Sequence, residues 1–122
     1  MRMLLLLVVI AGCIGAAQTQ LSFESGSGSC ASGPAEFNAE RIGSEVRFSG
    51  AISTSNPCYE LSASHSVSGN TIQIDISAEY KGGMCIQCTG TVPFEGNVTG
   101  LEGREYRLVI AENGRVLYEK TI

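Results

Sequence analysis

The sequence predicts one all-β domain: an antiparallel β-sandwich of about seven short strands, held together by disulfides. Apolar and polar residues alternate along most of the chain after Phe37, and no segment repeats its apolar residues with the 3.6-residue period of a helix. Turn-forming residues interrupt the alternation about every 8 to 12 residues, a spacing typical of sandwiches. Four of the five cysteines follow the apolar leader, an even number that is typical of small exported domains.

Composition limits the functions that this chain can have. Its 122 residues suffice for one domain, and 43% of them are hydrophobic, so the chain can bury a core. The formal net charge of −4 comes without any cluster of Lys and Arg. Because nucleic acids are bound through grouped basic side chains, we expect no nucleic-acid partner.

The N-terminus has the features of an export signal over residues 1–12. Arg2 supplies a positive charge, and an unbroken apolar run follows from Met3 to Ile10. Small residues come next, as signal peptidases require. The run is shorter than the roughly 20 residues of a transmembrane helix. We therefore expect the chain to be exported, and the leader to be removed.

The segment Ile10-Ala11-Gly12-Cys13 resembles the lipobox of bacterial and some archaeal lipoproteins. The resemblance implies that the Cys13 thiol receives a diacylglycerol and that cleavage makes Cys13 the first mature residue. Membrane lipid would then be a partner, and the protein would be lipid-anchored at the cell membrane or cell surface, outside the cytoplasm. The alternative is an ordinary signal peptide cut near Ala17, with Cys13 incidental.

Residues 13–35 are predicted to form the lipidated N-terminus and a flexible tether, and residues 36–122 the sandwich domain. The tether prediction depends on low apolar content and on the Gly/Ser run Ser25 to Ser29. Leu21 and Phe23 alternate with polar neighbours, so this segment could instead add a short edge strand.

The domain is expected to be a series of strands with two clear turns. Ser68-Gly69-Asn70 separates two alternating runs and predicts a hairpin, and Glu112-Asn113-Gly114 predicts a second turn. Gly90 could mark a bulge. The strands are expected at residues 45–52, 59–67, 72–78, 86–94, 106–110 and 115–121.

The stretch from Leu101 to Leu108 resembles the entry to the penultimate strand of immunoglobulin-like and fibronectin type III-like domains, where Leu, Gly and Tyr form a tyrosine corner. The resemblance implies a buried ring for Tyr106 and a hydrogen bond from its hydroxyl to the backbone upstream. The resemblance supports an immunoglobulin-like sandwich and gives no indication of function. The Cys…Trp…Cys core of a true immunoglobulin domain is missing from the sequence.

Four cysteines are predicted to form two structural disulfides, for which three connectivities exist. Alternation places Cys58 and Cys85 at strand ends, away from the core face. We therefore predict a Cys58–Cys85 bond, which leaves Cys30 to bond with Cys88. Such bridges stabilise a small exported domain.

Cys85 and Cys88 also form a CxxC pair, the spacing of a thiol-redox or metal site. A redox site needs a lowered thiolate pKa, usually from a helix start or a nearby cation, whereas the residues after Cys88 are typical of a strand. A zinc site would need a second closely spaced pair. An extracytoplasmic redox or metal-handling protein therefore stays as an alternative.

The other reactive side chains form no catalytic set in the sequence. His65 is the single histidine, Asp75 falls within a strand, and Glu102 and Glu105 alternate with arginines in a turn. Asn97 begins a glycosylation motif. We expect no enzymatic activity, no cofactor and no metal.

The sequence thus favours a membrane-anchored lipoprotein that acts as a non-enzymatic binding module or an envelope structural module. If it binds an envelope protein, the candidate surface is formed by the loops at Ser53 to Pro57 and Lys81 to Met84, where Gly, Ser, Asn and Pro leave backbone groups free. An inhibitor or adhesin-like protein is the remaining alternative.

Overall fold

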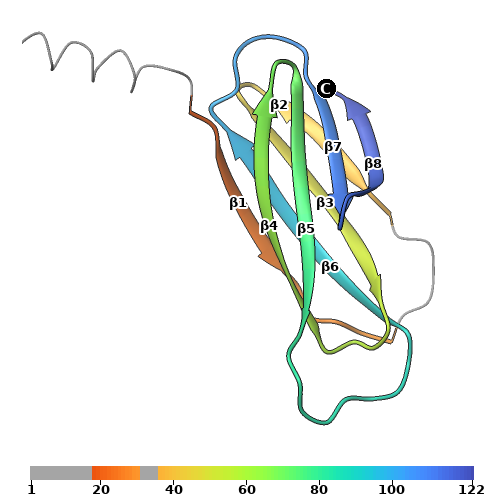
Figure 1. Ribbon diagram of the computed structural model, residues 1–122. Coiled ribbons are helices and arrows are strands. Elements are labelled where there is room, and N and C mark those ends of the chain that lie inside the picture. Colours follow the sequence, from red (N-terminus) through yellow and green to blue (C-terminus); the bar gives the residue numbers. More distant parts are fainter. Residues whose placement is uncertain (1–17, 31–35) are drawn as a thin grey trace, which may run out of the picture.

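The computed structural model describes residues 18–30 and 36–122. The predicted signal peptide and Cys13 lie outside the described residues. The described chain forms eight strands and no helix, packed as two four-stranded sheets (Figure 1). The strands are β1 (Gln20–Ser25), β2 (Asn38–Ile42), β3 (Glu45–Thr54), β4 (Tyr59–Ser68), β5 (Thr71–Tyr80), β6 (Gly90–Thr99), β7 (Arg107–Glu112) and β8 (Arg115–Thr121).

The first sheet has the strand order β1-β6-β3-β2 and the second β4-β5-β7-β8. The predicted all-β, disulfide-bonded sandwich is confirmed. Its second sheet is mixed, however, because β5 and β7 run parallel. The chain leaves this sheet after β5, forms β6 in the other sheet, and returns in the original direction as β7. This pairing departs from the all-antiparallel sheets of an immunoglobulin domain.

The period-two pattern places apolar side chains between the sheets. In β3 and β5, every second residue is buried, as expected for strands that cover a core on one face. The predicted hairpin is β4–β5, with Gly69 at a positive φ of 58° in its turn. The largest fully buried side chains are Val46, Ile52, Ile72, Ile74, Ile76, Val92, Val98, Leu108 and Ile110.

Two predicted boundaries need correction, and one strand was not predicted. Gln20–Ser25 pairs with β6 as β1, so the folded domain includes part of the predicted tether (residues 13–35) and begins before residue 36. Asn38–Ile42 forms β2, a strand that the sequence did not predict, because Ala39 is its single buried apolar residue. The strand expected over 86–94 begins at Gly90, and the β3–β6 register continues through that glycine without a bulge.

On each side of the sandwich, side-chain contacts link an edge strand of the first sheet to an edge strand of the second. Between β1 and β4, the Ser25 hydroxyl accepts a hydrogen bond of 2.9 Å from the Leu61 N–H. On the opposite side, the Phe37 and Tyr118 rings stack with their centroids 5.5 Å apart, and the Lys120 ammonium donates to the Ala39 carbonyl at 2.7 Å. Such contacts protect edge strands from pairing with other chains.

Tyr106 organises the loop between β6 and β7. Its ring is only 3% exposed, and its hydroxyl accepts a hydrogen bond of 3.1 Å from the Glu102 N–H, four residues upstream. The guanidinium groups of Arg41 and Arg104 lie 5.3 and 5.2 Å from the ring centroid. Arg41 also donates to the carbonyls of Glu102 and Arg104, at 2.6 and 3.0 Å, so this side chain from β2 fixes the loop at two points.

Candidate functional site

Both disulfides connect to the segment Lys81–Thr89, which joins β5 to β6 and is called the disulfide loop below. Cys85 is bonded to Cys58 and Cys88 to Cys30, with Cα–Cα distances of 6.1 and 5.7 Å. The predicted connectivity is confirmed. The two cysteines of the CxxC pair are bonded to distant partners and not to each other, which is the arrangement of structural bridges.

The disulfide loop has little regular structure of its own. Gly82 and Gly83 have φ values of 77° and 79°, which strongly favour glycine, and they turn the chain out of β5. The Lys81 N–H donates to the Cys58 carbonyl at 3.0 Å, next to the Cys58–Cys85 bond. The loop is therefore fixed at its base by a hydrogen bond and two covalent links, although it adds no side chain to the buried core.

The second predicted loop, Ser53–Pro57, lies at the same end of the sandwich. The Asn56 side chain accepts a hydrogen bond of 3.0 Å from the Cys58 N–H, and the Thr54 hydroxyl donates to the Asn56 carbonyl at 2.6 Å. Gly28 and Gly90 allow close approach to this loop: a Cβ on Gly28 would lie 2.1 Å from the Pro57 carbonyl oxygen, and one on Gly90 2.4 Å from that of Asn56. The structure thus brings together the two loops chosen from the sequence.

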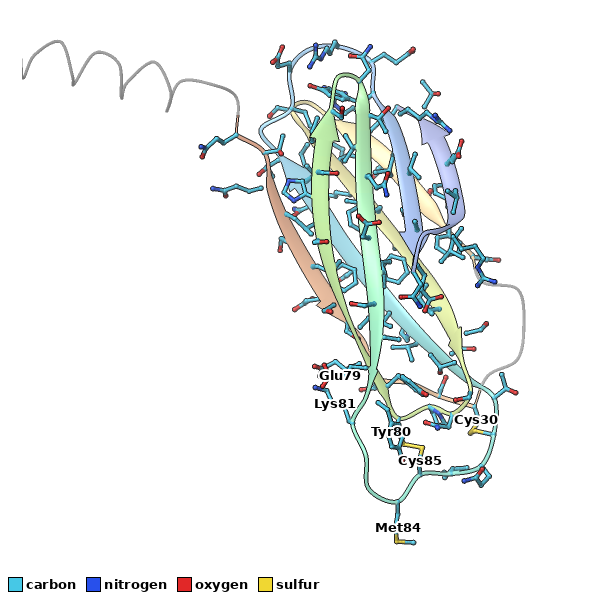
Figure 2. All side chains as sticks on the ribbon, in the orientation of Figure 1. Cys30, Glu79, Tyr80, Lys81, Met84 and Cys85 are labelled. Atoms are coloured by element: carbon cyan, nitrogen blue, oxygen red, sulfur yellow. A yellow bond between two sulfur atoms is a disulfide. The ribbon has the colours of Figure 1, made fainter. Side chains whose placement is uncertain are left out.

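The disulfide loop exposes large apolar side chains at its tip. Met84 is completely exposed (102%), Ile86 is 69% exposed and Tyr80, at the end of β5, is 46% exposed. Figure 2 shows Met84 projecting from the end of the molecule, beyond Cys85 and Tyr80. Of the five large exposed hydrophobic residues in the described chain, these three lie together in sequence, next to the disulfides. Clustered exposed apolar groups mark interaction sites more often than isolated ones do.

This end of the molecule carries little charge. Residues 53–58 and 82–89 contain no ionisable group apart from the bonded cysteines. Lys81 lies 3.3 Å from the Glu60 carboxylate and 3.7 Å from that of Glu79. The hydrogen bond to Glu60, and then the charges of Glu60 and Glu79, raise the pKa of Lys81. The tip is therefore uncharged and exposes apolar side chains, and at its base one lysine lies between two glutamates, a cluster with a net charge of −1.

The candidate catalytic side chains are not assembled into a site. His65 lies on the inward side of β4, where its Nε2 and the Thr19 hydroxyl are 2.9 Å apart beside a hollow of about 510 Å³. Asp75 is on the outer face of β5 and accepts from the Gln73 amide at 3.0 Å. Glu102 and Glu105 are exposed in the β6–β7 loop. Among residues 18–30 and 36–122, no three His, Cys, Asp or Glu side chains form a metal-binding group.

Asn97 lies within β6, on the outer face of the first sheet, beside a shallow hollow of about 440 Å³. Its amide nitrogen donates to the Glu45 carboxylate at 2.6 Å. This bond, followed by the one from Arg47, lowers the pKa of Glu45 below its ordinary value. A glycan on Asn97 would have to replace the bond to Glu45 in the middle of a strand.

The alternation pattern does not predict that Ile86 and Tyr80 are exposed. The strand expected over residues 86–94 includes Ile86, whereas the observed strand begins only at Gly90. Glycines mark both ends of the disulfide loop: Gly82-Gly83 before Met84 and Gly90 after Cys88. They are the sequence signal that this segment is a loop and not a strand.

Comparison of the chain with protein-family models, with curated proteins and with solved structures found no match. In the described part of the chain, no helix has the length and apolar character to cross a membrane.

Proposed function

We propose that this chain is a lipid-anchored protein outside the cytoplasm, and that it binds a protein partner through the tip of its disulfide loop without catalysing a reaction. The observation that carries the proposal is the exposure of Met84 and Ile86 on a segment held by both disulfides. A loop that is ordered before binding loses less conformational entropy when it binds, so apolar groups on it contribute more to affinity.

Two further features support the location and the anchor. Disulfides form and persist in oxidising compartments, which lie outside the cytoplasm. The lipobox-like segment that ends at Cys13 supplies the attachment: two or more acyl chains hold a protein on a membrane without a spanning helix.

Site-specific photo-crosslinking in the native host tests the binding surface. A photoreactive amino acid that replaces Met84 should give a discrete crosslinked adduct, because a fully exposed tip residue faces the partner directly. The same amino acid at Asp75, on the exposed face of β5, is the control and should give no such adduct. Adding Ile86→Asp to the Met84 probe should reduce the adduct at least tenfold, the loss expected when an interface anchor is removed.

Because Met84 and Ile86 are outside the core, these changes should leave the folded domain intact, which circular dichroism can verify. Equal adduct from positions 84 and 75, or an adduct that is unchanged by Ile86→Asp, would contradict the proposed surface.

A further inference from the structure

The two ends of the sandwich have different roles if Cys13 is lipidated. β1 begins at Gln20, which pairs with Thr99 at the end of β6. The disulfide loop leads into Gly90, the first residue of β6. The N-terminal chain therefore enters at one end of the molecule, and the exposed tip lies at the other (Figure 1). The ten residues of β6 separate these ends by about 33 Å.

The chain between Cys13 and the domain is short. Six residues, Ile14 to Thr19, separate Cys13 from Gln20. Even fully extended, this segment reaches only about 25 Å. It therefore cannot span the length of the sandwich, and an inverted orientation, with Met84 inserted end-on into the anchoring membrane, is excluded.

The charge of the outer faces disfavours a second orientation, in which one sheet lies flat on the membrane. On the outer faces, acidic groups outnumber basic ones. The first sheet carries Glu24, Glu40, Glu45 and Glu95 against Arg47, and the second Glu60, Asp75, Glu79 and Glu119 against Lys81 and Arg107. Anionic lipid headgroups repel such faces.

The end at which the N-terminal chain enters is formed by turns. The Leu101 N–H donates to the Ser44 carbonyl at 2.9 Å, and Arg104 donates to the Gly69 carbonyl at 3.2 Å, so the β2–β3 turn, the β4–β5 turn and the β6–β7 loop lie together. Arg41 and Arg104 are occupied by carbonyls of these turns and by the Tyr106 ring. These arginines are therefore not free to bind lipid phosphates. The short N-terminal segment is what keeps this end of the molecule near the membrane.

We infer that the anchored protein stands upright, with its turn end at the lipid headgroups and the disulfide loop held away from the membrane, toward a protein that approaches from the aqueous side. This inference rests on the proposed lipidation of Cys13. It assigns the partner of Met84 and Ile86 to the aqueous phase and not to the anchoring bilayer.

Fluorescence quenching on vesicles tests the orientation. The full lipidated protein, carrying one fluorescent unnatural amino acid at either Met84 or Gly103, is reconstituted into phosphatidylcholine vesicles that contain about one third phosphatidylglycerol and a headgroup spin label. Gly103 is suitable because it is exposed and a Cβ there meets nothing within 4 Å. We expect several-fold stronger quenching at position 103 than at position 84.

The outcomes separate the orientation from the anchor. Mass spectrometry of the purified protein should show acyl chains on Cys13, and the Cys13→Ser variant should fail to bind vesicles. If acyl chains are present but position 84 is quenched as strongly as position 103, the upright orientation is wrong and the anchor stands. If no acyl chains are found on Cys13, the proposed anchor is wrong and the orientation falls with it.

Discussion

Replacing Cys58 and Cys85 together by serine is expected to lower the free energy of unfolding by about 3 kcal/mol. The bond closes a loop across a sequence separation of 27 residues, and its loss restores conformational freedom to the unfolded chain. A small domain has about 5–15 kcal/mol of stability in total, so the change is large. Urea unfolding followed by circular dichroism measures it.

The same variant should also lose most of the adduct formed from a photoreactive group at position 84. The Cys58–Cys85 bond lies directly beside Met84, so its removal leaves the tip held by the Cys30–Cys88 bond and by hydrogen bonds at Lys81 and Gly83. A matched control replaces Ser62 and Ser77 by alanine. These residues join β4 and β5 through hydroxyls 3.1 Å apart on the exposed face, and their loss should cost less than about 1 kcal/mol. Equal destabilisation by the two double variants would contradict a structural role for the disulfide.

The substitution Ile74→Ala is expected to lower the free energy of unfolding by about 2–5 kcal/mol. Ile74 is completely buried in β5, a central strand of the second sheet, and its truncation leaves a cavity between the sheets. Thermal and urea unfolding of the purified variant measure the change.

The matched control is Ile86→Ala, which removes the same atoms from a side chain that is 69% exposed. Its effect on stability should stay within about 0.5 kcal/mol, the usual range for surface substitutions. This pair of variants tests whether Ile86 is a core residue, as the strand expected over 86–94 would imply, or an exposed residue of the disulfide loop. A loss at Ile86 comparable to that at Ile74 would show that Ile86 belongs to the core.

The sequence predicted the long central strands well, for a physical reason. Residues in β3 and β5 alternate between core and solvent, and each strand has several large apolar side chains, so the pattern is strong. The strand Asn38–Ile42 gave no comparable signal because Ala39 supplies almost all of its buried apolar surface. Edge strands bury less, and their patterns are correspondingly weaker.

Strand direction could not be read from the same pattern. Alternation shows which side chains are buried, but it does not say which sheet a strand joins. The parallel β5–β7 pair follows from the passage of β6 through the other sheet, a property of the whole topology. For the same reason, the alternation of Leu21 and Phe23 indicates a possible edge strand at β1 but not its partner β6, which pairs with it across 69 to 79 residues of sequence.

The predicted cysteine pairing is confirmed, although only Cys58 lies where strand alternation predicts it. Strand alternation predicts Cys85 at a strand end, away from the core face, whereas Cys85 lies in a loop where strand alternation does not apply. Cys58 does lie next to the first residue of β4, away from the core. Proximity of the two loops at one end of the sandwich, and not the facing of Cys85, accounts for the bond.

Peptide mapping of the exported protein under non-reducing conditions tests most directly whether the disulfide loop is covalently fixed, on which the proposed binding surface depends. Fragmentation between Ile86 and Gln87 assigns the two sulfurs of the CxxC pair separately. The expected result is Cys58 linked to Cys85 and Cys30 linked to Cys88. A bond between Cys85 and Cys88, or free thiols at both, would contradict a structural role for these cysteines and favour redox or metal chemistry.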